Sequence, residues 1–309
     1  MKFLLGRLGK LGLSALGATL LVSVFLDLLP GDPVEILLGE QAQSVDVAAL
    51  RHQIGLDRPL PEQVWFFLRD LATGELRTSL PPFQERVAAR LAEVAPRTGL
   101  LALAALLFAV CLALPLGVLA ASSRDGPLDR LSAILAVAGI SMPSFLVGHL
   151  LILFFGVRLG LLPVAGDDQA TSFLLPALTL GLGLSASLSR VTRASMLEVL
   201  REDYILAARA RGVPERRIVW RHALKNALLP ILTVLGLQAG AVLTGSVVVE
   251  KVFNWPGLGT FLLTAIQKRD YNAVRAAVLV FTLTYLVVNL ATDIAYALAD
   301  PRVRRAAAR

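Results

Sequence analysis

The sequence predicts an all-α, polytopic membrane protein with six transmembrane helices. Of its 309 residues, 56% are hydrophobic and only 17% are charged. Water-soluble domains rarely combine so much apolar content with so little charge, whereas several apolar spans of about 20 residues explain both values. Six such runs occur in the chain, at 9–29, 97–121, 131–157, 172–192, 229–250 and 274–298. We expect a single transmembrane domain over residues 1–309.

The first apolar run follows Lys2, Arg7 and Lys10, as the apolar core of a secretory signal peptide would. Its apolar stretch is longer than is usual for a signal peptide. No clear cleavage site with small residues precedes "LPGDP". We therefore expect it to remain as the first transmembrane helix.

The distribution of basic residues predicts which segments face the cytoplasm. With the N-terminus inside, the inner segments are 1–10, 122–130, 190–225 and the tail from Asp300. They hold 18 of the 30 Lys and Arg residues and only 7 of the 23 acidic residues. Cytoplasmic loops carry this excess of Lys and Arg. We expect both termini in the cytoplasm of a bacterium or archaeon, the chain in its cytoplasmic (inner) membrane, and segment 30–96 outside as an insert of short amphipathic helices.

The excess of Lys and Arg on the cytoplasmic side explains the net charge of +7. Nucleic-acid binding is not needed to explain it, so we expect no nucleic-acid partner. The sequence holds no G-x-x-x-x-G-K-[ST] phosphate loop, H-E-x-x-H or C-x-x-C motif. The three histidines, His52, His149 and His222, are scattered. We expect no cofactor, metal site or catalytic residue in this chain. The small residues of "GLGLSA" (181–186) and of Gly236-x-x-x-Gly240 are expected to pack closely against neighbouring helices.

Few polar groups interrupt the spans. Asp27 lies at the outer end of the first run and Asp293 well inside the sixth. A carboxylate at membrane depth is either functional or a hydrogen-bonded structural partner, and the pattern favours the second. Gln238, Thr244, Asn289 and Asp293 are candidates for a solute pathway, with hydrogen bonding between helices as the alternative.

Residues 190–228 are unusually basic for a segment between two spans. "SMLEVLREDYILAARARG" has helical spacing, with one apolar face made of Met196, Leu197, Leu200, Tyr204, Ile205 and Ala208. Gly212 is expected to end this helix in the left-handed conformation, Pro214 to begin the next, and Pro230 to mark the entry into the fifth span. Such an elbow either docks on a partner through its small residues and arginines or is a basic loop that sets topology.

This segment resembles the coupling loop of ABC importer permeases, whose signature is E-A-A-x-x-x-G. Here Leu206 stands in place of the Glu, before Ala207, Ala208 and Gly212. The variation is similar to that of the dipeptide/oligopeptide/nickel branch. Seven further segments of the chain also resemble sequences of that branch. They are "LLPGDPV" (28–34), "GLDRPLPEQ" (55–63), "GELRTSL" (74–80), "GISMPSFLVG" (139–148), "LPALTLGL" (175–182), "VVVEKVFNWPGLG" (247–259) and "DPRVR" (300–304).

The resemblance implies the type I ABC importer permease fold and a set of partners. These are a second homologous permease, cytoplasmic ATPase subunits that bind the ATP, an extracytoplasmic solute-binding protein and membrane lipid. It also implies that the ATPase is contacted through the coupling loop, at Leu206, Ala207, Ala208, Arg209, Ala210, Arg211, Gly212 and Pro214.

The expected solute is a dipeptide or oligopeptide, with a nickel chelate or glutathione as alternatives. Two other classes remain open from the residues. An ion-coupled secondary transporter would use Asp293. An intramembrane enzyme would need paired catalytic groups, for which His149 and Asp293 are the nearest single residues.

Overall fold

The computed structural model describes residues 2–28, 34, 48–49, 51–52, 55–78 and 85–299. Their secondary structure is helical, apart from an isolated antiparallel bridge between Arg77 and Arg86. The all-α prediction is thus confirmed. The described helices are α1 (Lys2–Asp27), α4 (Leu60–Thr73), α5 (Val87–Ser122), α6 (Pro127–Ser141), α7 (Ser144–Leu151), η1 (Ile152–Arg158), α8 (Leu174–Val199), α9 (Asp203–Ala210), α10 (Glu215–Arg217), η2 (Ile218–Ala223), α11 (Leu224–Val252), α12 (Leu258–Gln267) and α13 (Tyr271–Ala299).

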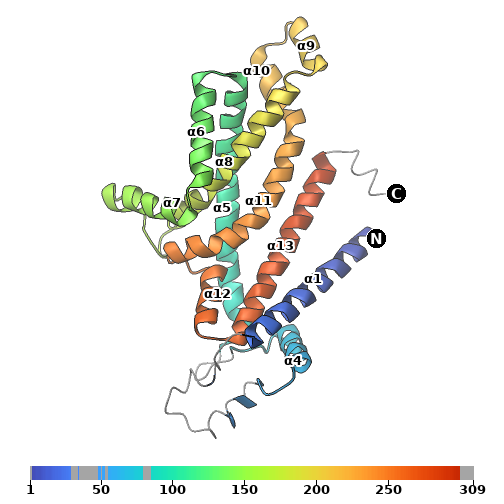
Figure 1. The fold of residues 1–309 in the computed structure, drawn as a ribbon, viewed down its shortest axis with the longest axis vertical. Coiled ribbons are helices and arrows are strands. Elements are labelled where there is room, and N and C mark those ends of the chain that lie inside the picture. Colours follow the sequence, from blue (N-terminus) through green and yellow to red (C-terminus); the bar gives the residue numbers. More distant parts are fainter. Residues whose placement is uncertain are drawn as a thin grey trace. The chain divides into compact units, whose positions relative to one another are not determined.

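The chain divides into two compact units. Unit 1 comprises residues 1–98 and 256–286, and unit 2 comprises residues 99–255 and 287–309. The long helices α5 and α13 each contribute one part to each unit (Figure 1). The two units are described separately below.

Unit 1 packs the insert helix α4 against the N-terminal parts of α5 and α13. Phe67 of α4 lies in a buried cluster with Val87 and Leu91 of α5 and Ala277 of α13. α12, which the sequence analysis did not predict, begins at Leu258, whose backbone N–H donates to Thr98 Oγ1 over 2.7 Å. α1 is fastened to α13 because the Tyr271 hydroxyl donates to the Leu26 carbonyl over 3.1 Å.

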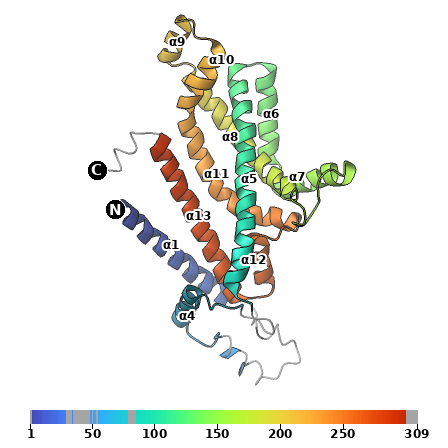
Figure 2. The same ribbon diagram turned by 180° about the vertical axis from the view of Figure 1, so that it is seen from behind.

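Unit 2 is a helical bundle in which α8 packs against α6, α7 and α11 (Figures 1 and 2). A Cβ atom at Gly181 of α8 would come within 2.7 Å of the Phe108 ring of α5. A Cβ atom at Gly236 of α11 would come within 2.0 Å of Thr292 Cγ2 of α13. Both glycines therefore allow neighbouring helices to approach closely, which confirms the packing prediction at these two positions.

The third predicted span is not one continuous helix. α6 ends at Ser141, and the chain resumes as α7 and η1 in a direction that differs by 107°. Pro143 explains the break, because a proline disfavours the helical conformation at the residue before it. Met142 accordingly has an extended backbone, with ψ at 125°. The apolar run predicted as a span over 131–157 is therefore broken at Met142 and Pro143.

Four described helical stretches, over 87–122, 174–199, 215–252 and 271–292, each contain a segment long and apolar enough to cross a membrane. The bent pair of α6 with α7–η1 counts as a fifth if it is one broken span. The apolar part of α1 over which side chains are described, Gly12–Asp27, is shorter than these. The chain is therefore a multi-pass membrane protein, and the count of six spans stays a prediction.

Two helix boundaries differ from those expected. α5 begins at Val87, ten residues before the predicted second span, so the helix extends into the predicted outer insert. Pro230 lies inside α11 and does not begin that helix, and its place at the entry into the fifth span stays a prediction. A proline inside a helix removes one backbone hydrogen bond, and membrane helices tolerate this loss where neighbouring groups satisfy the freed carbonyl.

Candidate functional site: the α9–η2 elbow

The basic segment forms a compact projection at one end of α8 and α11, which we call the elbow (residues 203–223; Figure 1). The helix predicted to run through 195–212 is interrupted, because α8 ends at Val199 and α9 begins at Asp203. Glu202 between them is extended, with ψ at 146°, and its carbonyl accepts the N–H groups of Ile205 and Leu206. α9 is therefore a separate short helix that turns away from α8.

Gly212 ends α9 as predicted. Its φ is +75°, in the left-handed region that glycine adopts at no steric cost. Its N–H donates to the Arg209 carbonyl over 2.9 Å, and the Val213 N–H donates to the Ala208 carbonyl over 3.2 Å. This pair of bonds is a Schellman motif. Pro214 then caps α10 from just outside the helix, and Glu215 is its first residue.

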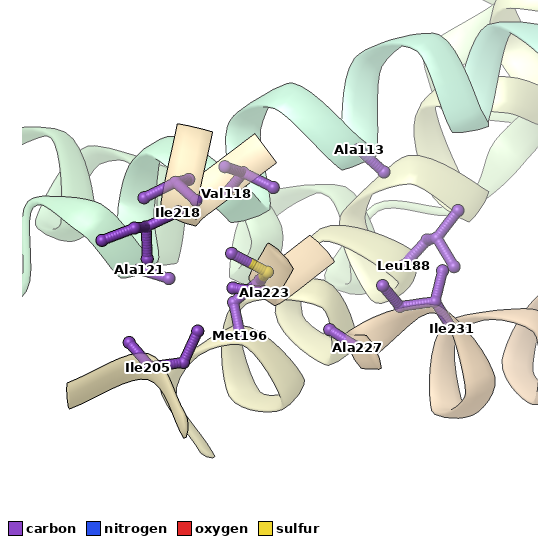
Figure 3. Packing of buried hydrophobic residues seen from close by; sticks show 11 residues of the cluster. Ala113, Val118, Ala121, Leu188, Met196, Ile205, Ile218, Ala223, Ala227 and Ile231 are labelled. Atoms are coloured by element: carbon purple, nitrogen blue, oxygen red, sulfur yellow. The ribbon is translucent and has the colours of Figure 1, made fainter. Parts of the chain in front are cut away.

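A buried hydrophobic cluster lies beneath the elbow (Figure 3). Ile205 of α9 and Ile218 of η2 have no exposed surface, and neither has Met196 of α8 or Val118 of α5. The predicted apolar face is thus confirmed for Met196 and Ile205. Tyr204 differs, since it is 42% exposed and its hydroxyl accepts a hydrogen bond from Asn226 Nδ2 over 2.7 Å. The elbow has two arms, α9 before Gly212 and α10–η2 after it. Because both arms pack on this cluster, the elbow is held firmly against α5, α8 and α11.

The outer face of the elbow carries most of the residues that the resemblance assigned to ATPase coupling. Leu206 is 53% exposed. Ala208 is partly buried against the cluster. The other members are exposed: Ala207, Arg209, Ala210, Arg211, Gly212 and Pro214. The structure therefore brings these positions together on one accessible surface.

The two arms of the elbow are joined by an ion pair across Gly212. Arg209 donates from Nη2 to Glu215 Oε1 over 2.6 Å and from Nε to Glu215 Oε2 over 3.1 Å. Hydrogen bonding to the carboxylate raises the pKa of Arg209, and the guanidinium lowers the pKa of Glu215. Arg209 is therefore engaged within the chain. Arg216 and Arg217 are exposed on the second arm.

The four candidate pathway residues lie in α11 and α13. Gln238 donates from Nε2 to the Leu184 carbonyl of α8 over 3.4 Å, and its Oε1 is buried with no partner among the described groups. Thr244 is exposed and Asn289 is partly buried. Asp293 belongs to α13, but its side chain lies outside the described part of the structure. Gln238 thus links two helices, and the pathway assignment stays a prediction.

His149, one of the two single residues named for catalytic chemistry, lies in ordinary surroundings. His149 Nδ1 pairs with the Phe145 carbonyl one turn earlier in its own helix, over 2.7 Å. Within the residues that the structure describes, no group of three or more His, Cys, Asp or Glu side chains is arranged to hold a metal ion.

Sequence reasoning missed four buried charged groups among the described residues: Asp129, Glu250, Asp270 and Arg275. Asp129 at the start of α6 is 5% exposed and forms a bidentate ion pair with Arg193 of α8. Glu250 of α11 is fully buried, and Arg275 of α13 is 4% exposed. Asp129 and Arg193 are 64 residues apart, so no local pattern could have joined them. Glu250 was assigned to the end of a span by hydropathy alone.

A basic elbow at one end of an apolar helical bundle fits the class of ABC importer permeases that the sequence resembles. Residues 113–305 match the family of the binding-protein-dependent transport system inner membrane component. Residues 1–82 match the N-terminal family of the same membrane components. The chain belongs to the binding-protein-dependent transport system inner membrane component family. Membership implies a transport component of the inner membrane that works with ATPase, solute-binding and second permease subunits.

Curated relatives span almost the whole chain. The glutathione transport system permease protein GsiC of Pectobacterium atrosepticum is 43% identical over 287 residues, which are 92% of each chain. GsiC of Salmonella typhimurium is 41% identical over 307 residues, 98% of this chain and 99% of the relative. GsiC of Escherichia coli K12 is 41% identical over 289 residues, 93% of each.

Among solved structures, an inward-facing conformation of the MetNI methionine ABC transporter matches with a TM-score of 0.61. The match has 19% sequence identity and covers 71% of this chain and 100% of the other. At this identity the likeness shows the fold alone, which is that of a type I ABC importer permease. Family and fold together decide against a secondary transporter.

Proposed function

We propose that this chain forms half of the pathway through which an ABC importer moves short peptides, with glutathione, itself a tripeptide, as the first solute to test. The observation that carries the solute class is the identity of 41–43% to glutathione permeases over more than nine tenths of both chains. Dipeptides and longer peptides share the backbone amides and carboxylates of glutathione. Discrimination among them is left to the solute-binding protein.

The elbow is the proposed contact to the ATPase. Both arms pack on the buried cluster below, so a movement of the elbow is transmitted to α5, α8 and α11 as a rigid-body shift. Small side chains at Ala207, Ala210 and Gly212 allow a partner groove to approach the backbone. ATP itself is bound by the partner subunits, and this chain acts without a catalytic site of its own.

The proposed topology places the elbow and both termini in the cytoplasm. It rests on the excess of Lys and Arg in the segments assigned to the inner side. The insert that contains α4 then faces outwards, where the solute-binding protein delivers its cargo.

The test is purification of the complex through a tag on this chain, followed by reconstitution in proteoliposomes with the solute-binding protein. We expect a second permease and ATPase subunits to co-purify. We expect ATP-dependent uptake of labelled glutathione or of a dipeptide. Purification of the chain without an ATPase would overturn the coupling proposal. Uptake of a nickel–histidine chelate with no uptake of glutathione or peptides would overturn the solute class.

A further inference from the structure

Unit 1 contains a cavity of about 350 Å³. It is an open pocket lined by α4, by the segments on either side of that helix, and by the first turns of α13. A volume of this size lies at the lower end of the range of pockets for small molecules. Its charged lining residues are Arg58, Arg69, Arg77, Arg275, Asp70 and Glu75.

Positive charge is in excess on these walls. Asp70 is engaged by Arg69, which donates from Nε and Nη2 to Oδ1 over 2.9 and 2.8 Å. The guanidinium of Arg58 lies 4.1 Å from the centre of the Phe66 ring, and that of Arg69 lies 4.7 Å from the same ring. The aromatic ring thus holds two cations at one wall. Four arginines against two acidic residues give the described walls a net positive charge, which favours anions.

Arg275 supplies the observation that identifies the ligand chemistry. Its side chain is 4% exposed, and its Nη2 donates to Gln63 Oε1, a neutral amide oxygen, over 2.8 Å. Its Nε is buried and has no partner among the described groups. Asp27 acts on it electrostatically, but no described carboxylate lies within ion-pairing distance of it. Buried guanidinium groups are normally paired, and their donors match the two oxygens of a carboxylate.

We propose that this cavity is a carboxylate-binding site on the outer side of the permease, with Arg275 as the principal ligand and Arg58 as a supporting charge. The proposal rests on the topology and the solute class given above. Two sources supply the same chemistry there: the terminal carboxylate of a peptide solute, and an acidic side chain of the solute-binding protein. Because Arg275 begins a spanning helix, an occupied site is connected directly to the transmembrane part of the chain.

The neighbouring hydrogen bonds explain how the site is held in shape. Gln63 donates from Nε2 to the Arg58 carbonyl over 2.9 Å while it accepts from Arg275. Asn272 donates from Nδ2 to the Arg77 carbonyl over 3.0 Å. α13 is therefore joined to α4 through Gln63, which also holds the segment before α4, and it is joined directly to the segment after α4 through Asn272. Gln63 and Asn272 are positioning residues that fix the cavity walls around Arg275.

The experiment is isothermal titration calorimetry on the whole transporter complex in lipid nanodiscs at low salt. The probes are a dipeptide with a free C-terminal carboxylate, the same dipeptide as its C-terminal amide, and the purified solute-binding protein. We expect either the free dipeptide to bind at least tenfold more tightly than the amide or the solute-binding protein to bind measurably. In either case Arg275→Gln should weaken that binding at least tenfold.

The matched control is Arg90→Gln, since Arg90 is an exposed arginine of unit 1 outside the cavity and is paired with Glu93. It should bind both probes as the unchanged complex does. If Arg275→Gln prevents assembly, Arg58→Gln is the second variant, with an expected loss of at least threefold. A loss confined to the dipeptide supports the solute as the source. A loss confined to the binding protein supports its acidic side chain.

The site would be overturned if Arg275→Gln and Arg58→Gln both left the binding of the dipeptide and of the solute-binding protein unchanged. It would also be overturned if the unchanged complex bound the free dipeptide no more tightly than the amide and did not bind the solute-binding protein. ATP-dependent uptake measured on the same preparation separates the two proposals. Uptake without a carboxylate site overturns the cavity and leaves the importer function standing. Carboxylate binding without uptake of any peptide does the reverse.

Discussion

The helices α4 and α9 end in the same backbone motif and continue differently. Gly74 after α4 has φ at +71°, and Gly212 after α9 has φ at +75°. In both, the glycine N–H and the next N–H donate back to two carbonyls of the helix. After Gly212 the chain continues into the second helical arm of the projecting elbow, whereas after Gly74 it folds back against α13 and lines the cavity. The same motif thus lies within a projecting elbow in one unit and beside an open pocket in the other.

The arginines of the elbow and of the cavity differ in their exposure and in their hydrogen-bond partners. In the elbow, Arg209 is paired with Glu215, six residues away, and both side chains remain largely in water. In the cavity, Arg275 is buried and bonds to Gln63, which is 212 residues away in the chain. Exposed arginines suit a reversible contact with another subunit. A buried arginine with an unsatisfied donor suits a small anionic ligand.

The largest expected effect comes from placing the same substitution in both motifs. Gly212→Val and Gly74→Val each force a β-branched residue into the left-handed region, which costs about 2 kcal/mol. Neither new Cβ atom meets another group, so the backbone strain is the shared effect. We expect Gly212→Val to lower ATP-driven uptake at least tenfold while ATP hydrolysis continues, and Gly74→Val to leave the amount of uptake per ATP hydrolysed near normal.

Uptake and ATP hydrolysis are measured in proteoliposomes, with melting temperatures to confirm that both variants lose similar stability. Normal uptake by Gly212→Val would break the comparison. Equal loss of uptake in Gly74→Val would show that the motif matters for folding alone.

A second pair of variants tests the two faces of α9. Ile205 has no exposed surface, whereas the next residue, Leu206, is 53% exposed. Ile205→Ala leaves a cavity in the cluster beneath the elbow and should cost about 3 kcal/mol. Leu206→Ala should change stability by less than about 0.5 kcal/mol and still weaken attachment of the ATPase, because it removes apolar surface from the contact face.

Hydrogen exchange of the elbow amides measures the first effect, and co-purification of the ATPase measures the second. Faster exchange in Leu206→Ala than in Ile205→Ala would reverse the assignment of the faces. Undiminished ATPase attachment in Leu206→Ala would remove Leu206 from the contact surface.

The elbow was largely predictable because its determinants lie close together in the sequence. The apolar spacing around Met196 and Ile205 and the glycine at 212 are local signals, and the structure confirms both. Pro214 was predicted as the first residue of the next helix and lies one residue before it. The break before Asp203 was not predicted, since nothing in the helical periodicity requires Glu202 to be extended. Only the tertiary packing of α9 on the cluster decides where that helix turns.

The cavity was not predictable for the opposite reason. Its walls come from residues 55–78 and 271–275, two segments separated by almost 200 residues. Hydropathy assigned Arg275 to the start of a span and gave no sign that it would be buried beside Gln63. The bend at Pro143 was missed in a similar way, because apolar composition is the same on both sides of the break. Composition identifies apolar helices, and the contacts between distant segments decide how they bend and what they enclose.

The smallest expected effect concerns the ion pair that joins the arms of the elbow. Glu215 has a lowered pKa in the folded chain because Arg209 donates two hydrogen bonds to its carboxylate. A lowered folded pKa gives stability that is present above the unfolded pKa of about 4.3 and is lost as the pH falls through the folded value. Both side chains are more than a third exposed, so solvent screening limits the contribution to about 0.5 kcal/mol.

Glu215→Gln should therefore lower the melting temperature slightly at pH 7, and the difference from the unchanged chain should shrink as the pH is lowered below about 4. The control is Glu62→Gln, an exposed glutamate of the first turn of α4 in the other unit. A difference that grows on acidification would contradict the assigned direction of the pKa shift. A difference of several kcal/mol at pH 7 would mean that the elbow depends on this ion pair more than on the buried cluster, and the contrast between a projecting elbow and an open pocket would then have to be drawn again.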